Sequence, residues 1–93
     1  MSEDEQLEML IEQTINGAIT AIPAQLEEIK QSKDILKVEN PNEFVFGIIM
    51  GMALGMAGAL MTAQKGIPTL EDQLKVRDLV YKKIPDIRAQ IFK

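Results

Sequence analysis

Two methionines are the first residues in this sequence whose type and spacing could support chemistry. Met52 and Met56 stand four residues apart, which places both thioethers on one side of a helix. Thioether sulfur is a soft ligand that suits Cu(I), so the pair is a candidate copper site. Methionine also fills irregular gaps in hydrophobic cores. We expect that role for both residues, with no metal and no cofactor bound.

Acidic residues are numerous, but their spacing does not suit catalysis. Glu27 and Glu28 are adjacent, so a helix would direct their side chains about 100° apart, which makes them a poor acid–base pair. The acids from Glu3 to Glu12 are typical of a solvated helix face. The chain has no histidine and no cysteine, which removes the usual base near neutral pH and the usual soft metal ligands. We therefore expect no enzymatic activity and no small-molecule substrate.

Charge divides the 93-residue chain into three parts. Residues 1–43 carry ten acids and three lysines, residues 44–63 carry no charge, and residues 64–93 carry seven bases and four acids. The net charge of −4 and the low aromatic content do not suit nucleic-acid binding, which needs phosphate neutralisation and base stacking. The acidic start lacks the apolar core of a secretory signal. We therefore expect a cytoplasmic protein, unless the uncharged segment itself enters a membrane.

Residues 1–39 show the apolar spacing of amphipathic helix with an acidic outer face. Ser2 is the expected N-cap, and the acids that follow it suit the positive end of the helix dipole. Pro23 interrupts the segment, so either the helix kinks there or a second helix begins with Pro23 in its first turn. A break follows, and the central segment, residues 42–65, is expected to begin at an Asn42 cap.

A second amphipathic segment occupies residues 69–93. Thr69 and Asp72 have the spacing of a capping box at its start, and Pro85 interrupts its apolar stripe. The alternation typical of strands is sustained nowhere in the sequence. We therefore expect a single all-α domain, a small helical bundle. In it, a central apolar helix rich in glycine and methionine is packed between two proline-interrupted amphipathic helices.

Four glycines of the central segment share one side of the expected helix. At 100° per residue, Gly47, Gly51, Gly55 and Gly58 fall within about 80°, and Ala59 lies at the edge of this sector. Each glycine inside a helix costs about 1 kcal/mol relative to alanine. Close approach of another helix, as in a glycine zipper, would compensate that cost.

The shared side of the glycines has three possible explanations. The glycines make room for the amphipathic helices of the same chain, they form a contact between copies, most simply in a homodimer, or they lie there incidentally. The small core expected of 93 residues would gain stability from such association. We expect Gly51→Ile to lower thermal stability, to disrupt self-association, or both. Ala57 lies away from the glycine sector, so isoleucine there should disturb a glycine-face contact much less.

The uncharged run from Phe44 to Ala63 also permits a membrane alternative. Its 20 residues would span about 30 Å as a helix, the thickness of a bilayer core. The chain would then be a small single-pass membrane protein, an accessory subunit or pore former that oligomerises through the glycine face, with its C-terminus in the cytoplasm. The two amphipathic segments favour the soluble bundle, because each needs an apolar surface to cover. The first expectation is thus a soluble protein that self-associates or binds a partner by helix packing.

Overall fold

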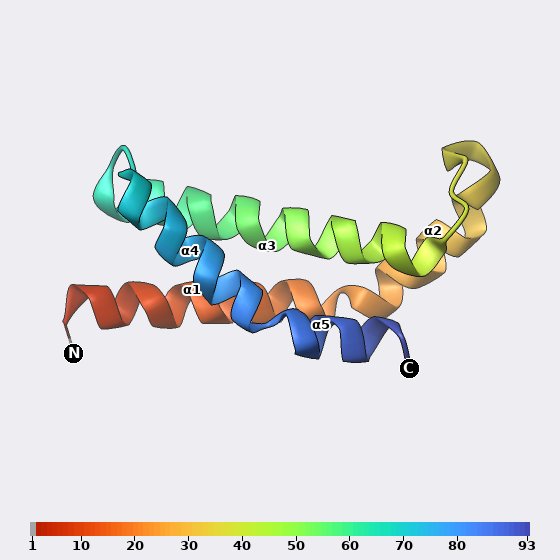
Figure 1. Ribbon diagram of the computed structural model, residues 1–93, viewed down its shortest axis with the longest axis horizontal. Helices are drawn as coiled ribbons and strands as arrows, with labels where there is room; N and C mark the ends of the chain where they lie inside the picture. The colour runs from red at the N-terminus through yellow and green to blue at the C-terminus, as the bar shows by residue number, and fades with distance from the viewer. Residues whose placement is uncertain (1) are drawn as a thin grey trace.

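The computed structural model describes residues 2–93, and these residues form helices and no strand (Figure 1). In chain order the elements are α1 (Glu3–Thr20), α2 (Ile22–Leu36), α3 (Pro41–Lys65), α4 (Leu70–Lys82) and α5 (Ile84–Ile91). The helices pack against one another, and each of the other four contacts α3. The all-α bundle expected from the sequence is confirmed.

The helices form an elongated body of 46 × 24 × 17 Å. Figure 1 shows α1 and α3 running lengthwise one below the other, with α2 continuing from α1 towards the N-terminal end of α3. The chain then leaves the other end of α3, α4 descends diagonally across α1, and α5 lies along the lower side of the body. A depth of 17 Å corresponds to about two helix layers.

Prolines divide both amphipathic segments into two helices each. Pro23 lies in the first turn of α2, and Pro85 lies in the first turn of α5. The missing N–H of proline costs nothing in a first turn, because that donor has no partner inside the helix there. A new helix therefore begins at each proline, which decides the question that the sequence left open at Pro23.

The helix caps follow the local sequence with one exception. The Ser2 hydroxyl accepts a hydrogen bond from the Glu5 N–H at 3.2 Å, as expected. At α3 the expected cap, Asn42, is wrong: the side chain of Asn40 accepts the Glu43 N–H at 3.2 Å instead. Pro41 explains the difference, since proline favours the first position of a helix and the cap must then precede it.

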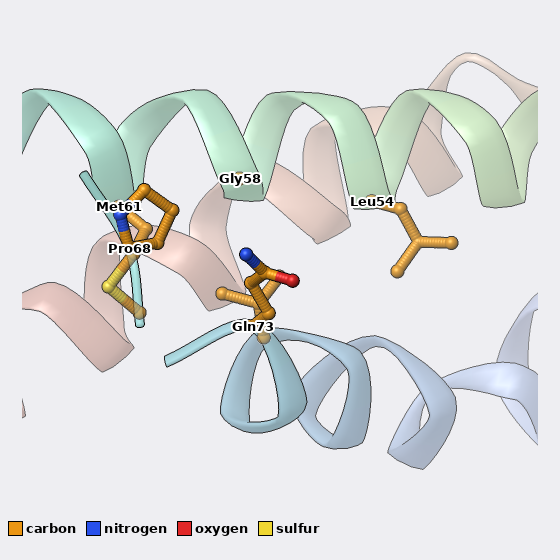
Figure 2. Close-up of a pocket in the computed structure, with 6 residues that line it drawn as sticks. Leu54, Gly58, Met61, Pro68 and Gln73 are labelled. Carbon is orange, nitrogen blue, oxygen red and sulfur yellow. The ribbon is translucent and has the colours of Figure 1, made fainter. Parts of the chain in front are cut away.

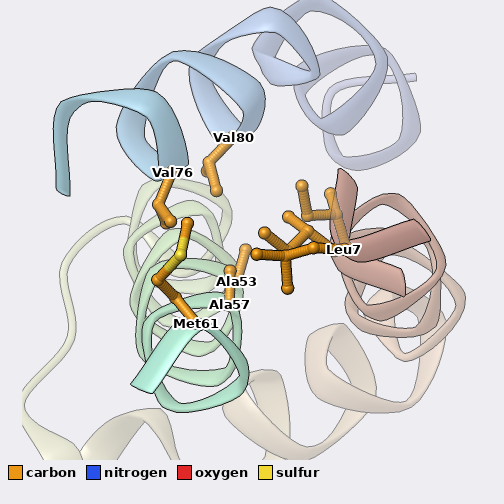
Figure 3. Close-up of a cluster of buried hydrophobic side chains, with 8 residues drawn as sticks. Leu7, Ala53, Ala57, Met61, Val76 and Val80 are labelled. Atoms are coloured by element: carbon orange, nitrogen blue, oxygen red, sulfur yellow. The ribbon is translucent and has the colours of Figure 1, made fainter. Parts of the chain in front are cut away.

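The core consists of two clusters of buried apolar side chains that meet along α3. In one, α3 packs against α1 and α4 (Figure 3); its members are Leu7, Ile11, Ile15, Ala53, Ala57, Met61, Val76 and Val80. In the other, α3 packs against α2, α5 and the C-terminal end of α1; its members are Ala18, Ile22, Ile29, Val45, Ile49, Ile87 and Ile91. Across the described chain, every buried residue is apolar. Burial of these stripes is therefore the main force that holds the bundle together.

The central helix is covered on one side and open on the other. Its buried residues recur at every fourth position: Val45, Ile49, Ala53, Ala57 and Met61. In Figure 3, where α3 is seen nearly end-on, α1 and α4 lie on adjacent sides of it. Only 28% of its most apolar 18-residue window is buried. The central helix is thus packed between the amphipathic helices, as expected, and they leave one of its faces uncovered.

Candidate interaction surface

One side of α3 is left largely uncovered by the rest of the chain, and it carries no charge. Its exposed or half-buried residues, which we call the open face, are Phe44, Gly47, Ile48, Gly51, Gly55, Gly58, Ala59 and Thr62. At 100° per residue, this set lies opposite the row of buried residues. The open face includes the five residues that the sequence suggested for helix packing.

The glycines of the open face have empty space beside them. A Cβ atom built on Gly47, Gly51, Gly55 or Gly58 would meet no heavy atom within 4 Å in the described chain, apart from the adjacent backbone of α3. They therefore do not make room for the amphipathic helices of the same chain, which was one of the three explanations considered. Nothing inside the described chain compensates their cost in helix stability, about 1 kcal/mol each.

Six residues of the open face form a straight line along the helix. Phe44, Ile48, Gly51, Gly55, Gly58 and Thr62 are separated by alternating steps of four and three residues, the spacing of a coiled-coil contact line. Their sizes are uneven. The two large side chains stand at the N-terminal end, where Phe44 is 40% exposed, and small ones occupy the rest. Sequence reasoning that followed only the glycines missed this line, although the spacing is readable from the sequence.

A hollow lies beside Gly58, between α3 and α4 (Figure 2). Its volume is ≈ 170 Å³, and its lining residues are Leu54, Gly58, Met61, Pro68, Gln73 and Val76. Pockets for drug-sized ligands usually enclose about 300–1,000 Å³, so the hollow is small for such a ligand. A cavity of about 150 Å³ holds a benzene ring, so the hollow has room for one apolar side chain.

The methionines of the candidate copper pair lie at the margin of the open face. Met52 is half-buried and Met56 is 47% exposed, whereas Met61 is buried in the core. The expectation of a core-filling role is therefore wrong for Met56, because at 100° per residue its side chain points about 60–100° away from the neighbouring buried residues Ala53 and Ala57. Among the described residues, no group of three or more histidines, cysteines, aspartates or glutamates could hold a metal ion.

Charged contacts tie the C-terminal end of α3 to its neighbours. The Lys65 ammonium lies 3.0 Å from a carboxylate oxygen of Asp4 and 3.9 Å from one of Asp72. The hydrogen bond and charge of Lys65 lower the pKa of Asp4 below its ordinary value. The pKa of Asp72 is also lowered, chiefly by hydrogen bonds from the backbone and side chain of Thr69. Both carboxylates are therefore ionised at neutral pH.

A second charged contact ties the N-terminal part of α3 to α5. The Arg88 guanidinium donates a hydrogen bond to the Glu43 carboxylate at 2.8 Å. It also lies over two aromatic rings, 4.6 Å from the centre of Phe46 and 4.5 Å from that of Phe92. Such cation–π contacts add to the ion pair. Charge is thus confined to the two ends of α3, and the face between them stays apolar.

No protein-family model matches this sequence, and no curated protein or solved structure matches it either.

Proposed function

We propose that this chain is a non-catalytic helical protein that associates through the open face of α3 with another helix, most simply that of a second copy. One observation carries the proposal: the glycines of this face weaken the helix, and no atom of the described chain packs against them. A partner helix that approached the glycines closely would supply the missing compensation. The absence of charge between Phe44 and Ala63 favours burial of this face, because no ion would have to lose its water.

Isoleucine at Gly51 tests the proposal directly. The added side chain would enter open space in the monomer, so Gly51→Ile should keep its helix content and stay folded. The same side chain would hold a partner helix away from the face, because overpacking a close contact typically costs about 1–3 kcal/mol. We therefore expect Gly51→Ile to move the protein from dimer to monomer in size-exclusion chromatography with light scattering.

Gly17→Ile is the matched control for this experiment. Gly17 also lies inside a helix, is exposed, and has no heavy atom of the described chain near its added Cβ, but it belongs to α1. This variant should keep the molar mass of the wild-type protein. An unchanged mass for folded Gly51→Ile would contradict association through the open face.

A single-pass membrane protein that oligomerises through the same face is the second candidate. Among the described residues, α3 is the one helix long and apolar enough to cross a membrane, with a mean hydropathy of 2.1 over its best window. That arrangement would leave the C-terminus in the cytoplasm. It would also separate the other helices from α3 and expose side chains such as Ile15, Val80 and Ile87, which favours the soluble, cytoplasmic form.

High-speed centrifugation of a cell lysate without detergent separates the two candidates. A soluble helical protein should remain in the supernatant at its full expressed amount. Recovery in the membrane fraction, with release by detergent but not by high salt, would favour the single-pass candidate instead.

A further inference from the structure

We infer, on the basis of the proposed association through the open face, that the partner of α3 is a second copy of this chain in antiparallel orientation. In this dimer, Ile48 of each copy enters the hollow beside Gly58 of the other. The surface of the whole molecule, the sizes of the residues along the open face and the hollow itself support this arrangement.

The monomer exposes more surface than is usual for a protein of its mass, and a dimer would bury the excess. A monomeric protein of 10.4 kDa is expected to expose about 5,400 Å². This chain exposes 6066 Å², and its radius of gyration is 14.6 Å where about 12 Å is typical of its length. The excess of about 700 Å² is close to the roughly 800 Å² that each partner buries in an interface of standard size.

The order of side-chain sizes along the open face selects the antiparallel orientation. With Gly51 of one copy beside Gly55 of the other, an antiparallel pair places Ile48 opposite Gly58 and Phe44 opposite Thr62. Every large side chain then meets a small one, and two-fold symmetry repeats each pair. A parallel pair would instead place Phe44 against Phe44 and Gly58 against Gly58. That arrangement overpacks one end and leaves a void at the other, and both are unfavourable.

The alternating steps of four and three residues keep this contact long. Residues with that spacing stay on one side of a helix when two helices cross at about 20°. The contact would then extend from Phe44 to Thr62, about 27 Å along the helix axis. A contact of this length would extend along nearly the whole uncharged part of α3, Phe44 to Ala63.

The hollow beside Gly58 can accommodate the Ile48 side chain of the second copy. Gly58 has no side chain to fill the space, and Figure 2 shows this glycine above the gap in which Leu54 and Gln73 extend between α3 and α4. Ile48 is half-buried and packs partly against the second core cluster of its own chain, and the exposed part of its side chain is available to a partner. An Ile48 side chain from the second copy would fit as a knob into this hole, the packing found where helices meet closely.

Disulfide cross-linking tests the orientation. The sequence contains no native cysteine, so any disulfide must join the introduced residues. Ile48→Cys and Gly58→Cys are prepared as separate proteins, mixed, oxidised and run on a non-reducing gel. In the antiparallel dimer the two different cysteines face each other, so the mixture should form a cross-linked dimer. Each protein alone should not, because like positions lie about 15 Å apart along the axis and a disulfide needs Cα atoms about 4.4–6.8 Å apart.

A second cysteine pair repeats the test at other positions, in case a variant of the first pair does not fold. Phe44→Cys and Thr62→Cys change exposed residues, so both proteins should keep the wild-type circular dichroism spectrum. Their mixture should also cross-link, whereas each alone should not. Gly17→Cys on α1 measures the background from random collisions.

The other outcomes would overturn the inference in distinguishable ways. Cross-linking of each protein with itself, but not across the mixture, would show a parallel dimer and would leave association through the open face standing. A dimeric mass with cross-linking no higher than the Gly17→Cys background would place the interface elsewhere and would overturn both proposals. A monomeric mass at all concentrations would exclude the second copy as the partner.

Discussion

Asp72 links the start of α4 to the rest of the molecule through two kinds of contact. Its carboxylate accepts the Thr69 N–H at 3.0 Å, and its own N–H donates to the Thr69 hydroxyl at 3.1 Å. The same carboxylate lies near Lys65, the last residue of α3. One side chain therefore caps α4 and holds the turn between α3 and α4.

Replacing this carboxylate should produce a pH-dependent loss of stability. The pKa of Asp72 is lowered from 3.8 in the folded protein, so its ionised form stabilises the fold at pH values above 3.8. That contribution is lost as the pH falls below 3.8 and through the lowered pKa. We expect Asp72→Ala to melt a few degrees below the wild-type protein at pH 7, and the difference to shrink towards zero in strong acid.

Thermal melts between pH 2 and pH 7 on both proteins measure this effect. Glu71→Ala removes a charge from the same helical turn and serves as the control for charge alone. A melting difference for Asp72→Ala that stays constant over the whole pH range would show that ionisation of Asp72 contributes nothing.

The contacts of single residues were predictable where they are local. Ser2 and Thr69 form the expected caps because each hydrogen bond joins residues three positions apart. The contact of Arg88 with Glu43 joins residues 45 positions apart, so it depends on how α5 lies against α3. No spacing in the sequence indicates such a pair.

The two faces of α3 should respond in opposite ways to the same substitution. Ala57 is fully buried and contributes to the cluster between α1, α3 and α4, whereas Gly51 is exposed. Ala57→Ile would force extra volume into a filled core, which typically costs about 1–3 kcal/mol. We expect this variant to unfold at a clearly lower urea concentration than the wild-type protein. Gly51→Ile should unfold at nearly the same urea concentration as the monomeric wild-type protein.

Urea unfolding followed by circular dichroism, at a concentration low enough to keep every protein monomeric, makes this comparison. Ala24→Ile, at an exposed position of α2, controls for isoleucine in a helix. Equal midpoints for Ala57→Ile and Ala24→Ile would contradict the assignment of Ala57 to the core. The smaller effect expected of Ala57→Ile on a glycine-face contact stays a prediction, and the burial of Ala57 adds the expectation that this variant destabilises the fold.

Which face of α3 is buried could not be read from its sequence. The amphipathic helices have polar and apolar sides, so the burial of residues such as Ile11, Ile15, Val80 and Ile87 was predictable. Between Phe44 and Ala63 the sequence is apolar in every direction. The choice of buried face there depends on small differences in fit against the other four helices, and tertiary packing alone decides it.

The molecule as a whole should behave as a concentration-dependent assembly held by apolar contacts. Association stabilises the folded state by mass action, so the melting temperature of the wild-type protein should rise with protein concentration. The interface between the ends of α3 is uncharged, so this dependence should change little between low and moderate salt. Differential scanning calorimetry over a hundredfold concentration range at two salt levels measures both.

The melting temperature of Gly51→Ile should stay flat over the same concentration range. A wild-type melting temperature that is independent of concentration would contradict a reversible dimer. A strong loss of the concentration dependence in salt would instead point to an interface built from the charged ends of the molecule.

The central position of α3 has a consequence for the order in which the protein can be made. During synthesis, α1 and α2 leave the ribosome before α3 exists, so their apolar stripes have no surface on which to fold. These two helices carry eight acids and two lysines, and the resulting negative charge should keep the unfinished chain soluble during this interval. We therefore expect the nascent protein to depend on the acidic face of its N-terminal helices until α3 emerges and the bundle can close.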